Sequence, residues 1–260
     1  MKRFLARHRR NRMVRALVRL ASGVVEGAEN LDYDATSNGE ERLLRVLGQH
    51  LEAREVFDVG ANVGEWARMA RAAFPEARLH CFEILPGTFQ QLSEALGRDP
   101  AARLNAVGLS DAAEEVTLKV FSQESQLTTM TEFPHELPHE RVQASTRTGD
   151  DYLAENDIEH VDLLKIDTEG AEPRVLEGFR ETLEERRVSV VQFEYGRVNI
   201  LTHHLLRDFH EFFDRLGYRV GKVFPTHVEF RDYDLSHEDF IGPNFLAVDA
   251  ARSDLVRALS

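Results

Sequence analysis

The chain has 260 residues, with 45 acidic and 32 basic side chains and a formal net charge of −13. Its hydrophobic fraction of 42%, which includes 16 Phe, is enough for a sizeable core and excludes wholesale disorder. No stretch approaches the roughly 18 apolar residues that cross a bilayer, and the single cysteine excludes a disulfide framework and a multi-Cys zinc site. The acidic balance argues against nucleic acid as a partner. We therefore expect a soluble, cytoplasmic globular protein.

The first 20 residues differ from the rest in charge. They contain eight Lys and Arg and no acid, whereas the remaining residues carry 24 basic and 45 acidic side chains. Apolar residues recur there at loosely helical spacing: Phe4, Leu5, Met13, Val14, Leu17 and Val18. This pattern predicts a basic amphipathic helix in an N-terminal arm and helical extension over residues 1–50. The helix either packs on the chain's own acidic body or stays mobile; the alternatives are peripheral contact with an anionic membrane and docking on another subunit of a homo-oligomer.

From residue 40 onward, short apolar or β-branched runs alternate with longer helical patterns. Helices are predicted over 40–51, 64–73, 86–96, 171–179 and 205–216. Strands are predicted over 56–59, 78–83, 104–109, 161–166, 188–193, 218–223 and 245–248, with an inserted or antiparallel strand at 115–121 and a long loop over 122–149. The alternation predicts one α/β domain over residues 51–250, built on a doubly wound, mostly parallel, seven-stranded sheet, and then a C-terminal tail over 251–260.

A glycine-rich turn follows the first predicted strand, where residues 58–64 read DVGANVG. Glycine at 60 permits a sharp turn, Asn62 can adopt a positive φ, and Gly64 lets the next helix approach the sheet or a ligand closely. The second strand ends in Glu83, whose carboxylate can accept two hydrogen bonds from a ribose diol. The combination predicts a nucleoside-containing cofactor.

The identity of that cofactor depends on Asp58. A dinucleotide site favours Gly-x-Gly-x-x-Gly, which brings backbone amides to a pyrophosphate. Here an acid stands two residues before the first glycine, and the central glycine is missing. An acid repels a pyrophosphate but suits a cationic sulfonium or ammonium group, so S-adenosylmethionine (SAM) fits better than NAD. A nicotinamide-dependent oxidoreductase of the same fold is the alternative.

A second motif, LKIDTEGAE at residues 164–172, follows the predicted strand at 161–166. Three carboxylates and a lysine so close together are costly to place near a buried cleft unless they have a role. The simpler interpretation is a solvated helix start, with acids near its positive end. Lys165 is predicted to pair with Asp167 or Glu169.

Five pieces of the sequence together resemble the FkbM-type family of SAM-dependent methyltransferases over roughly residues 55–250. They are FDVGANVGEWA (57–67), HCFEILP (80–86), STRTGDDYL (145–153), VDLLKIDTEGAEPRVLEG (161–178) and VVQFEY (190–195). The string KIDTEGAE is the most specific; the residues after Glu83 and the string TRTGDDYL depart from the usual pattern. The resemblance implies a class I methyltransferase, Rossmann-like fold and transfer of a methyl group from SAM, typically to a hydroxyl oxygen of a sugar, polyketide or other small metabolite. A non-catalytic SAM-binding scaffold is a further alternative.

The resemblance also implies which residues contact the cofactor: Asp58, Gly60, Asn62, Gly64, Glu83, Ser110 and Asp111. The glycine turn lines the methionine end of SAM, Glu83 takes the ribose hydroxyls, and Ser110 or Asp111 lies where the adenine is contacted. Asp167 and Glu169 face the side on which the methyl group lands.

An acceptor hydroxyl must lose its proton, and the candidate bases are Glu169, Asp167, His203, His204 and His227. We favour Glu169 and then Asp167, because a surface or helix-start position is the simpler interpretation of each histidine. We expect no metal, although Asp167 and Glu169 with Glu194 would suit Mg²⁺ if the three converged. The segments 122–145 and 195–204 are predicted to form the acceptor pocket.

Overall fold

The computed structural model describes residues 1–121, 128–129 and 139–260, and its centre is an eight-stranded sheet. The strands are β1 (Glu55–Val59), β2 (Arg78–Phe82), β3 (Ala102–Asn105), β8 (Val161–Ile166), β9 (Val188–Glu194), β10 (Tyr218–Val223), β11 (Val228–Phe230) and β12 (Asn244–Asp249). Their order is β11-β10-β12-β9-β8-β1-β2-β3. Strands β3, β2, β1, β8 and β9 pair in parallel, and β12 runs antiparallel between β9 and β10. The predicted doubly wound, class I methyltransferase-like sheet is confirmed, and β11 adds a strand that the sequence pattern did not reveal.

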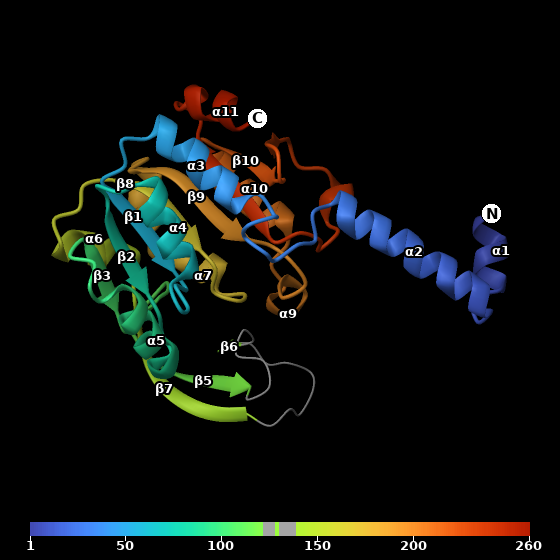
Figure 1. Ribbon diagram of the computed structural model, residues 1–260, viewed down its shortest axis with the longest axis horizontal. Coiled ribbons are helices and arrows are strands. Elements are labelled where there is room, and N and C mark those ends of the chain that lie inside the picture. Colours follow the sequence, from blue (N-terminus) through green and yellow to red (C-terminus); the bar gives the residue numbers. More distant parts are fainter. Residues whose placement is uncertain (122–127, 130–138) are drawn as a thin grey trace.

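Helices cover both faces of this sheet (Figure 1). One face is covered by α3 (Glu40–His50), α4 (Glu65–Ala73), α5 (Pro86–Leu96) and α11 (Ser253–Leu259). The other face is covered by α6 (Gly149–Glu155), α7 (Glu172–Gly178), α8 (Arg180–Glu184) and α10 (Leu206–Arg215). Neighbouring strand residues such as Val56 and Phe57, or Leu163 and Leu164, enter opposite cores, which is why apolar residues stand next to one another in the central strands.

Residues 251–260, expected as a tail, contain α11, whose Leu255 and Leu259 are fully buried against the same core as α3. The chain's only cysteine, Cys81, lies in β2 and is also fully buried. Burial raises the pKa of the Cys81 thiol. This thiol is therefore protonated and shielded from solvent.

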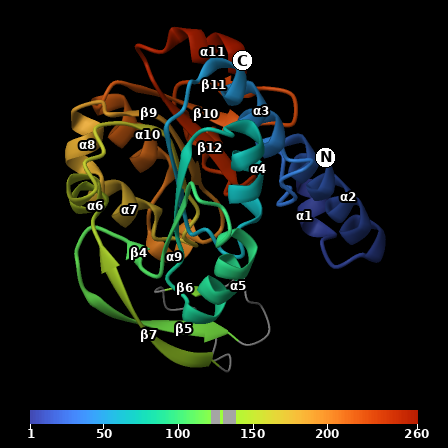
Figure 2. The same cartoon turned by 60° about the vertical axis from the view of Figure 1, so that its left-hand side comes forward.

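A second sheet lies below the carboxyl ends of the central strands (Figure 2). Its strands are β4 (Gly108–Leu109), β5 (Glu115–Phe121), β6 (Thr128–Thr129) and β7 (His139–Arg147), in the order β4-β7-β5-β6. The strand predicted over 104–109 is thus divided, because the chain leaves the central sheet after Asn105 and pairs next with β7. The antiparallel strand at 115–121 is confirmed.

The loop predicted over 122–149 is wrong at 128–129, which forms β6, and over 139–149, which forms β7 and the start of α6. The segments 122–127 and 130–138 of that prediction lie outside the described residues. Short elements complete the chain: α9 (Asn199–Thr202) and a 3₁₀ turn at Leu235–His237.

The N-terminal arm, residues 1–28, projects from the body as α1 (Lys2–Arg7) and α2 (Arg12–Ala28) (Figure 1). The two helices separate at Asn11, whose side-chain oxygen accepts a hydrogen bond of 2.8 Å from the Met13 amide and begins α2. The single predicted helix is therefore two helices, and α2 continues past residue 20. No helix in the described part of the chain is long and apolar enough to span a membrane.

Candidate active site

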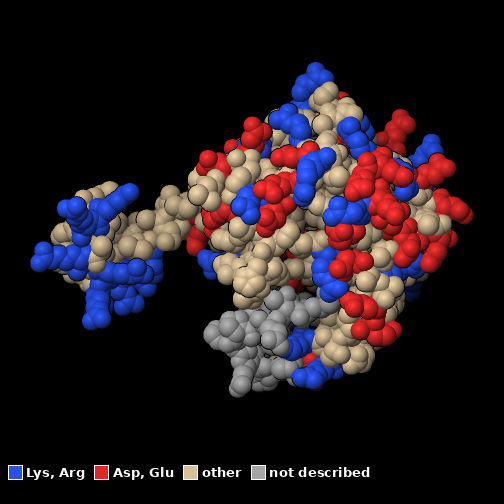
Figure 3. Space-filling model, turned by 180° about the vertical axis from the view of Figure 1, so that it is seen from behind, with Lys and Arg blue, Asp and Glu red and all other residues tan. Residues whose placement is uncertain are grey.

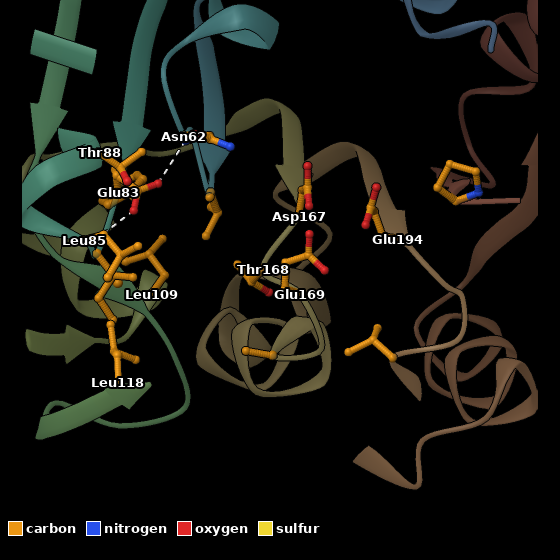
Figure 4. A pocket seen from close by; sticks show the side chains of 18 of the residues that line it. Asn62, Glu83, Leu85, Thr88, Leu109, Leu118, Asp167, Thr168, Glu169 and Glu194 are labelled. Atoms are coloured by element: carbon orange, nitrogen blue, oxygen red, sulfur yellow. Dashed lines mark hydrogen bonds between the residues drawn. The ribbon is translucent and has the colours of Figure 1, made fainter. Parts of the chain in front are cut away.

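A cavity of about 460 Å³ opens at the carboxyl ends of β1, β2, β8 and β9. Leu109 of β4 and Leu118 of β5 close one side of it, so the second sheet forms a wall. Figure 4 shows Glu83 on one side of this space and Asp167, Glu169 and Glu194 on the other. In open α/β sheets ligands bind at this edge, and the volume is that of a small-molecule site.

The glycine turn forms part of the cavity surface, and its backbone has the predicted conformation. Gly60, Asn62 and Gly64 all have positive φ, at 79°, 47° and 82°. A Cβ on Gly60 would overlap the carbonyl oxygen of Asp167, so only glycine lets the end of β1 pass the end of β8. Gly60 and Asn62 line the cavity, whereas Gly64 faces Leu92 and Leu96 of α5 instead.

Glu83 is held in place by backbone amides. Its Oε2 accepts a hydrogen bond of 2.9 Å from the Asn62 amide, and its Oε1 accepts one of 2.8 Å from the Leu85 amide (Figure 4). The side chain is buried and lines the cavity. Burial raises the pKa of Glu83, against the lowering effect of the two hydrogen bonds. Since each carboxylate oxygen has further lone pairs, Glu83 can also accept hydrogen bonds from the two hydroxyls of a ribose diol.

Lys165 joins the ends of β1 and β8. Its buried ammonium lies 3.1 Å from Asp58 Oδ1 and 3.1 Å from Asp167 Oδ2. It also donates a hydrogen bond of 3.3 Å to the Gly60 carbonyl. Although burial opposes the charge, Asp167 and Asp58 raise the pKa of Lys165, so the ammonium stays protonated. The predicted pairing of Lys165 with an acid of the second motif is confirmed.

Asp58 differs from its expected role. It is 2% exposed, it points to Lys165 within the sheet, and it does not line the cavity. A carboxylate in the middle of a strand that is covered on both faces is directed to an internal partner rather than to a ligand. The carboxyl groups at the cavity surface are those of Glu83, Asp167, Glu169 and Glu194 instead.

The loop after β8 presents these acids through an unusual backbone. Glu169 has a φ of 52° and Gly170 a φ of 103°. Glu172, fully buried at the start of α7, holds the loop: its Oε1 accepts hydrogen bonds from the Thr168 amide (2.9 Å), the Thr168 hydroxyl (3.0 Å) and the Gly170 amide (3.1 Å). Left-handed backbone at a residue other than glycine persists only where its surroundings impose it, and it is concentrated at functional sites.

The acids of the cavity repel one another and are partly removed from water. Burial, with Asp167 and Glu172, raises the pKa of Glu169 to about 7. Burial and the neighbouring Asp167 and Glu169 raise the pKa of Glu194 as well. A carboxyl group with a pKa near 7 can hold or release a proton at neutral pH. Within the ranges that the structure describes, no three His, Cys, Asp or Glu side chains are grouped closely enough to hold a metal ion. This holds for Asp167, Glu169 and Glu194 too.

Several predicted residues lie away from the cavity. Ser110 is buried and donates to Asp111, which pairs at 2.7 Å with Arg174 on another surface. His203 ends α9 in a left-handed conformation, and His204 packs edge-on against Phe209. His227 stacks on Phe224. None of these histidines lines the cavity, and neither do Ser110 and Asp111.

Other cavity residues were only partly anticipated. In the predicted acceptor segment 195–204, Tyr195, Arg197, Val198 and Leu201 do line the cavity. Tyr33, Thr88 and Thr146 line it too, and sequence reasoning missed them. Thr88 stands one turn into the helix that follows Glu83, a position that could have been noticed; Tyr33, in the connection from α2 to α3, gives no signal in the sequence.

Comparisons with known proteins identify a family and several similar proteins. The model of the methyltransferase FkbM domain matches residues 58–220. The hexuronic acid methyltransferase AglP of Haloferax volcanii is 26% identical over 175 residues, which cover 66% of this chain and 70% of that protein. The 2-O-methyltransferase NoeI of Sinorhizobium fredii is 28% identical over 151 residues, which cover 53% of this chain and 62% of that protein. The crystal structure of methyltransferase FkbM from Methylobacillus flagellatus KT shares 16% identity with a TM-score of 0.49, over 75% of this chain and 44% of that one.

Proposed function

Because the chain belongs to the FkbM methyltransferase domain family, whose members use SAM, we propose that it methylates a hydroxyl oxygen of a sugar, polyketide or other small metabolite. The observation that carries the proposal is Glu169, a carboxyl group with a pKa of about 7 in a left-handed turn at the cavity surface, opposite the fixed carboxylate of Glu83. The names of two relatives, a hexuronic acid methyltransferase and a 2-O-methyltransferase, support an oxygen of a small molecule as the acceptor.

The residues of the cavity fit SAM on chemical grounds. Glu83 would accept hydrogen bonds from the ribose hydroxyls, and the turn at Gly60 and Asn62 would lie along the methionine end. Asp167, Glu169 and Glu194 place three carboxyl groups in this region, and a bound cation would favour the ionised forms of Glu169 and Glu194, whose pKa values are raised in its absence. When bound, SAM supplies an electrophilic methyl group on a positively charged sulfur.

Glu169 would act on the acceptor. Its carboxylate oxygen takes the proton of the acceptor hydroxyl, which makes that oxygen a better nucleophile, and a positioned base of this kind typically contributes about 10²–10⁴ in rate. The remaining advantage comes from holding the acceptor in line, which can be worth on the order of 7–11 kcal/mol. Thr168 lines the same cavity as Glu169, as do Tyr195, Arg197, Val198 and Leu201, and these residues would orient the acceptor.

The first experiment is isothermal titration of the purified protein with SAM and with NAD. We expect micromolar binding of SAM, no heat with NAD, and binding of SAM weakened about a hundredfold by Glu83→Ala, because two charge-assisted hydrogen bonds are lost. Glu76→Ala, at an exposed glutamate in the connection from α4 to β2, is the matched control. Failure of well-folded protein to bind SAM would contradict the proposal.

The second experiment identifies the acceptor. Sugars, including hexuronic acids, and polyketide alcohols are incubated with SAM carrying a labelled methyl group, in the presence of Mg²⁺ or of a chelator. Transfer to oxygen, located by mass spectrometry, supports the proposal. Transfer only to nitrogen or carbon would contradict it.

A further inference from the structure

The N-terminal arm carries an apolar surface that methyl transfer does not use. In the described part of the chain, most of the large apolar side chains that are exposed belong to it: Met1, Phe4, Met13, Leu17, Val18, Leu20, Val24 and Val25. On the body, the corresponding residues are Tyr33, Ile200 and Leu235, which are separate in sequence. Within α1 and α2 only Val14 is buried. Isolated apolar side chains on a surface need no explanation, but a contiguous set indicates a binding surface.

The exposed residues of α2 form one continuous face. At 3.6 residues per turn, Met13, Leu17, Leu20 and Val24 fall along one side of the helix, with Val18 and Val25 beside them. Arg12, Arg15 and Arg19 fall on the opposite side. Met13 and Leu20 are 81% and 68% exposed, so the residues that the structure describes leave these side chains uncovered. With 17 residues the helix is about 25 Å long.

The charged residues at the start of the arm are all of one sign. Residues 1–20 carry eight basic side chains and no acid, and Figure 3 shows Lys and Arg gathered at the far end of the projection, away from the mixed charges of the body. Whatever binds the arm must therefore offer both an apolar medium and negative charge.

Three occupants can be compared on this basis. The body of a second copy is acidic but offers few exposed large apolar residues among those described. The arm of a second copy offers an apolar face but the same positive charge. An anionic lipid bilayer offers hydrocarbon below a negatively charged surface, which is the combination that basic amphipathic helices bind.

We propose that the N-terminal arm binds the surface of an anionic membrane. In this arrangement α2 lies in the plane of the lipid headgroups, with the face of Met13, Leu17, Leu20 and Val24 towards the acyl chains. The basic residues contact lipid phosphates. The helix does not span the bilayer, for which about 20 apolar residues are needed.

The arm joins the body beside the cavity. The carboxylate of Glu26, near the end of α2, lies 3.9 Å from the guanidinium of Arg197, and Arg197 and Tyr33 both line the cavity. A bound arm therefore keeps the cavity close to the lipid surface. Membrane binding is nevertheless a property of the arm and is independent of the proposed methyl transfer.

The test is co-sedimentation of the full chain with vesicles. We expect binding to an equimolar mixture of phosphatidylcholine and phosphatidylglycerol, weak binding to phosphatidylcholine alone, and weakening by salt. Reversing Arg12, Arg15 and Arg19 to Glu should weaken binding about a hundredfold or more, since each basic residue near an anionic surface contributes about fivefold. Leu17→Glu with Val24→Glu should abolish binding, because it places charges in the apolar face.

Matched controls lie on the body. Leu235→Glu changes an apolar side chain that is 77% exposed, and Arg68→Glu with Arg219→Glu reverses exposed charges; both should bind vesicles as the unmodified protein does. Titration with SAM verifies that every variant is folded. Three results would each overturn the proposal. The first is no binding to the anionic vesicles, and the second is equal binding to both kinds of vesicle. The third is that the protein does not bind vesicles but self-associates, and that Leu17→Glu with Val24→Glu abolishes the self-association.

Discussion

Two loops meet at the floor of the cavity, and the chemical features on which their conformation and role depend are different. The glycine turn, residues 60–64, follows β1, and the acid loop, residues 167–171, follows the neighbouring β8. Both contain residues in left-handed conformation. The glycine turn depends on the absence of side-chain atoms, since a Cβ at Gly60 would overlap the acid loop. The acid loop depends on carboxylates, two of which face the cavity while Glu172 holds the backbone. We therefore expect the glycine turn to be disturbed by substitutions that add side-chain atoms. The acid loop should be impaired by substitutions that remove a charge.

The largest effect is expected for Glu169→Gln, which removes the proposed base and keeps the shape of the acid loop. The rate should fall about 10²–10⁴-fold, while the affinity for SAM stays within a few-fold. In the unmodified protein the rate should rise as the pH passes about 7, because the pKa of Glu169 is raised to about 7 and the ionised form is the base. Single-turnover rates from pH 5 to 9 measure this, with the exposed Glu76→Gln as control. An unchanged rate would exclude Glu169 as the base.

The same variant should change stability in a way that reveals the sign of the pKa shift. Because the pKa of Glu169 is about 7 in the folded protein and 4.5 ordinarily, the unfolded chain binds fewer protons between these values, and stability falls as the pH rises through this window. Glu169→Gln should therefore be more stable than the unmodified protein at pH 8, by roughly 3 kcal/mol, and equally stable near pH 4. Urea unfolding at both pH values measures the difference.

Lys165 links the two loops, and its loss is expected to have the next largest effect. Lys165→Met leaves the buried Asp58 without its partner, which should lower the free energy of unfolding by about 3–5 kcal/mol. Adding Asp58→Asn should recover part of that loss, since no unpaired charge then remains at this position. Denaturant unfolding of both variants is the measurement. A double variant less stable than Lys165→Met would contradict the role assigned to the pair.

Gly60→Ala tests the glycine turn. The added methyl group should lower the free energy of unfolding by about 3 kcal/mol, through a left-handed backbone at alanine and an overlap with Asp167. Gly87→Ala in α5 is the matched control, because no atom lies within 4 Å of its added Cβ, and it should be neutral or stabilising by up to about 1 kcal/mol. Equal effects of the two substitutions would show that the crossing of the loops does not require glycine.

The smallest effect is expected for Thr168→Val. The substitution keeps the shape of the side chain and removes one of the three hydrogen bonds to Glu172 Oε1, so stability should fall by about 1 kcal/mol. Thr117→Val, on the exposed face of the second sheet, should change stability by less than about 0.5 kcal/mol. A loss of several kcal/mol at Thr168 would mean that the acid loop depends on this hydroxyl as much as on its carboxylates.

The elements that could be predicted are those with a strong local pattern. Buried parallel strands such as β8 are mostly apolar, and the helix α5 begins with Pro86. By contrast β7 was missed, because among the residues that pair with β5 only Val142 and Ala144 are apolar. The start of α6 had a usable signal, since Thr148 accepts a hydrogen bond from the Asp151 amide three residues later.

The residues of the site likewise fall into those that a local pattern predicts and those that it does not. The positive φ of Asn62 and the pairing of Lys165 follow from residue type and position in a motif, and both are confirmed. Tyr33 and Thr146 come to the cavity from separate parts of the chain, and no local pattern specifies that. His203 and His204 were predicted as candidate bases because they follow β9 in the sequence. A position in sequence does not determine the side to which a short helix directs its side chains.

The burial of Cys81 makes the arm accessible to spectroscopy. Since the chain's one cysteine is fully buried with a raised thiol pKa, it should resist thiol reagents in the folded protein. A cysteine introduced at Ser22, exposed on α2 near its arginines, would then be the single reactive thiol. A fluorophore or spin label attached there would report the motion and surroundings of the arm without removal of any native residue from the core.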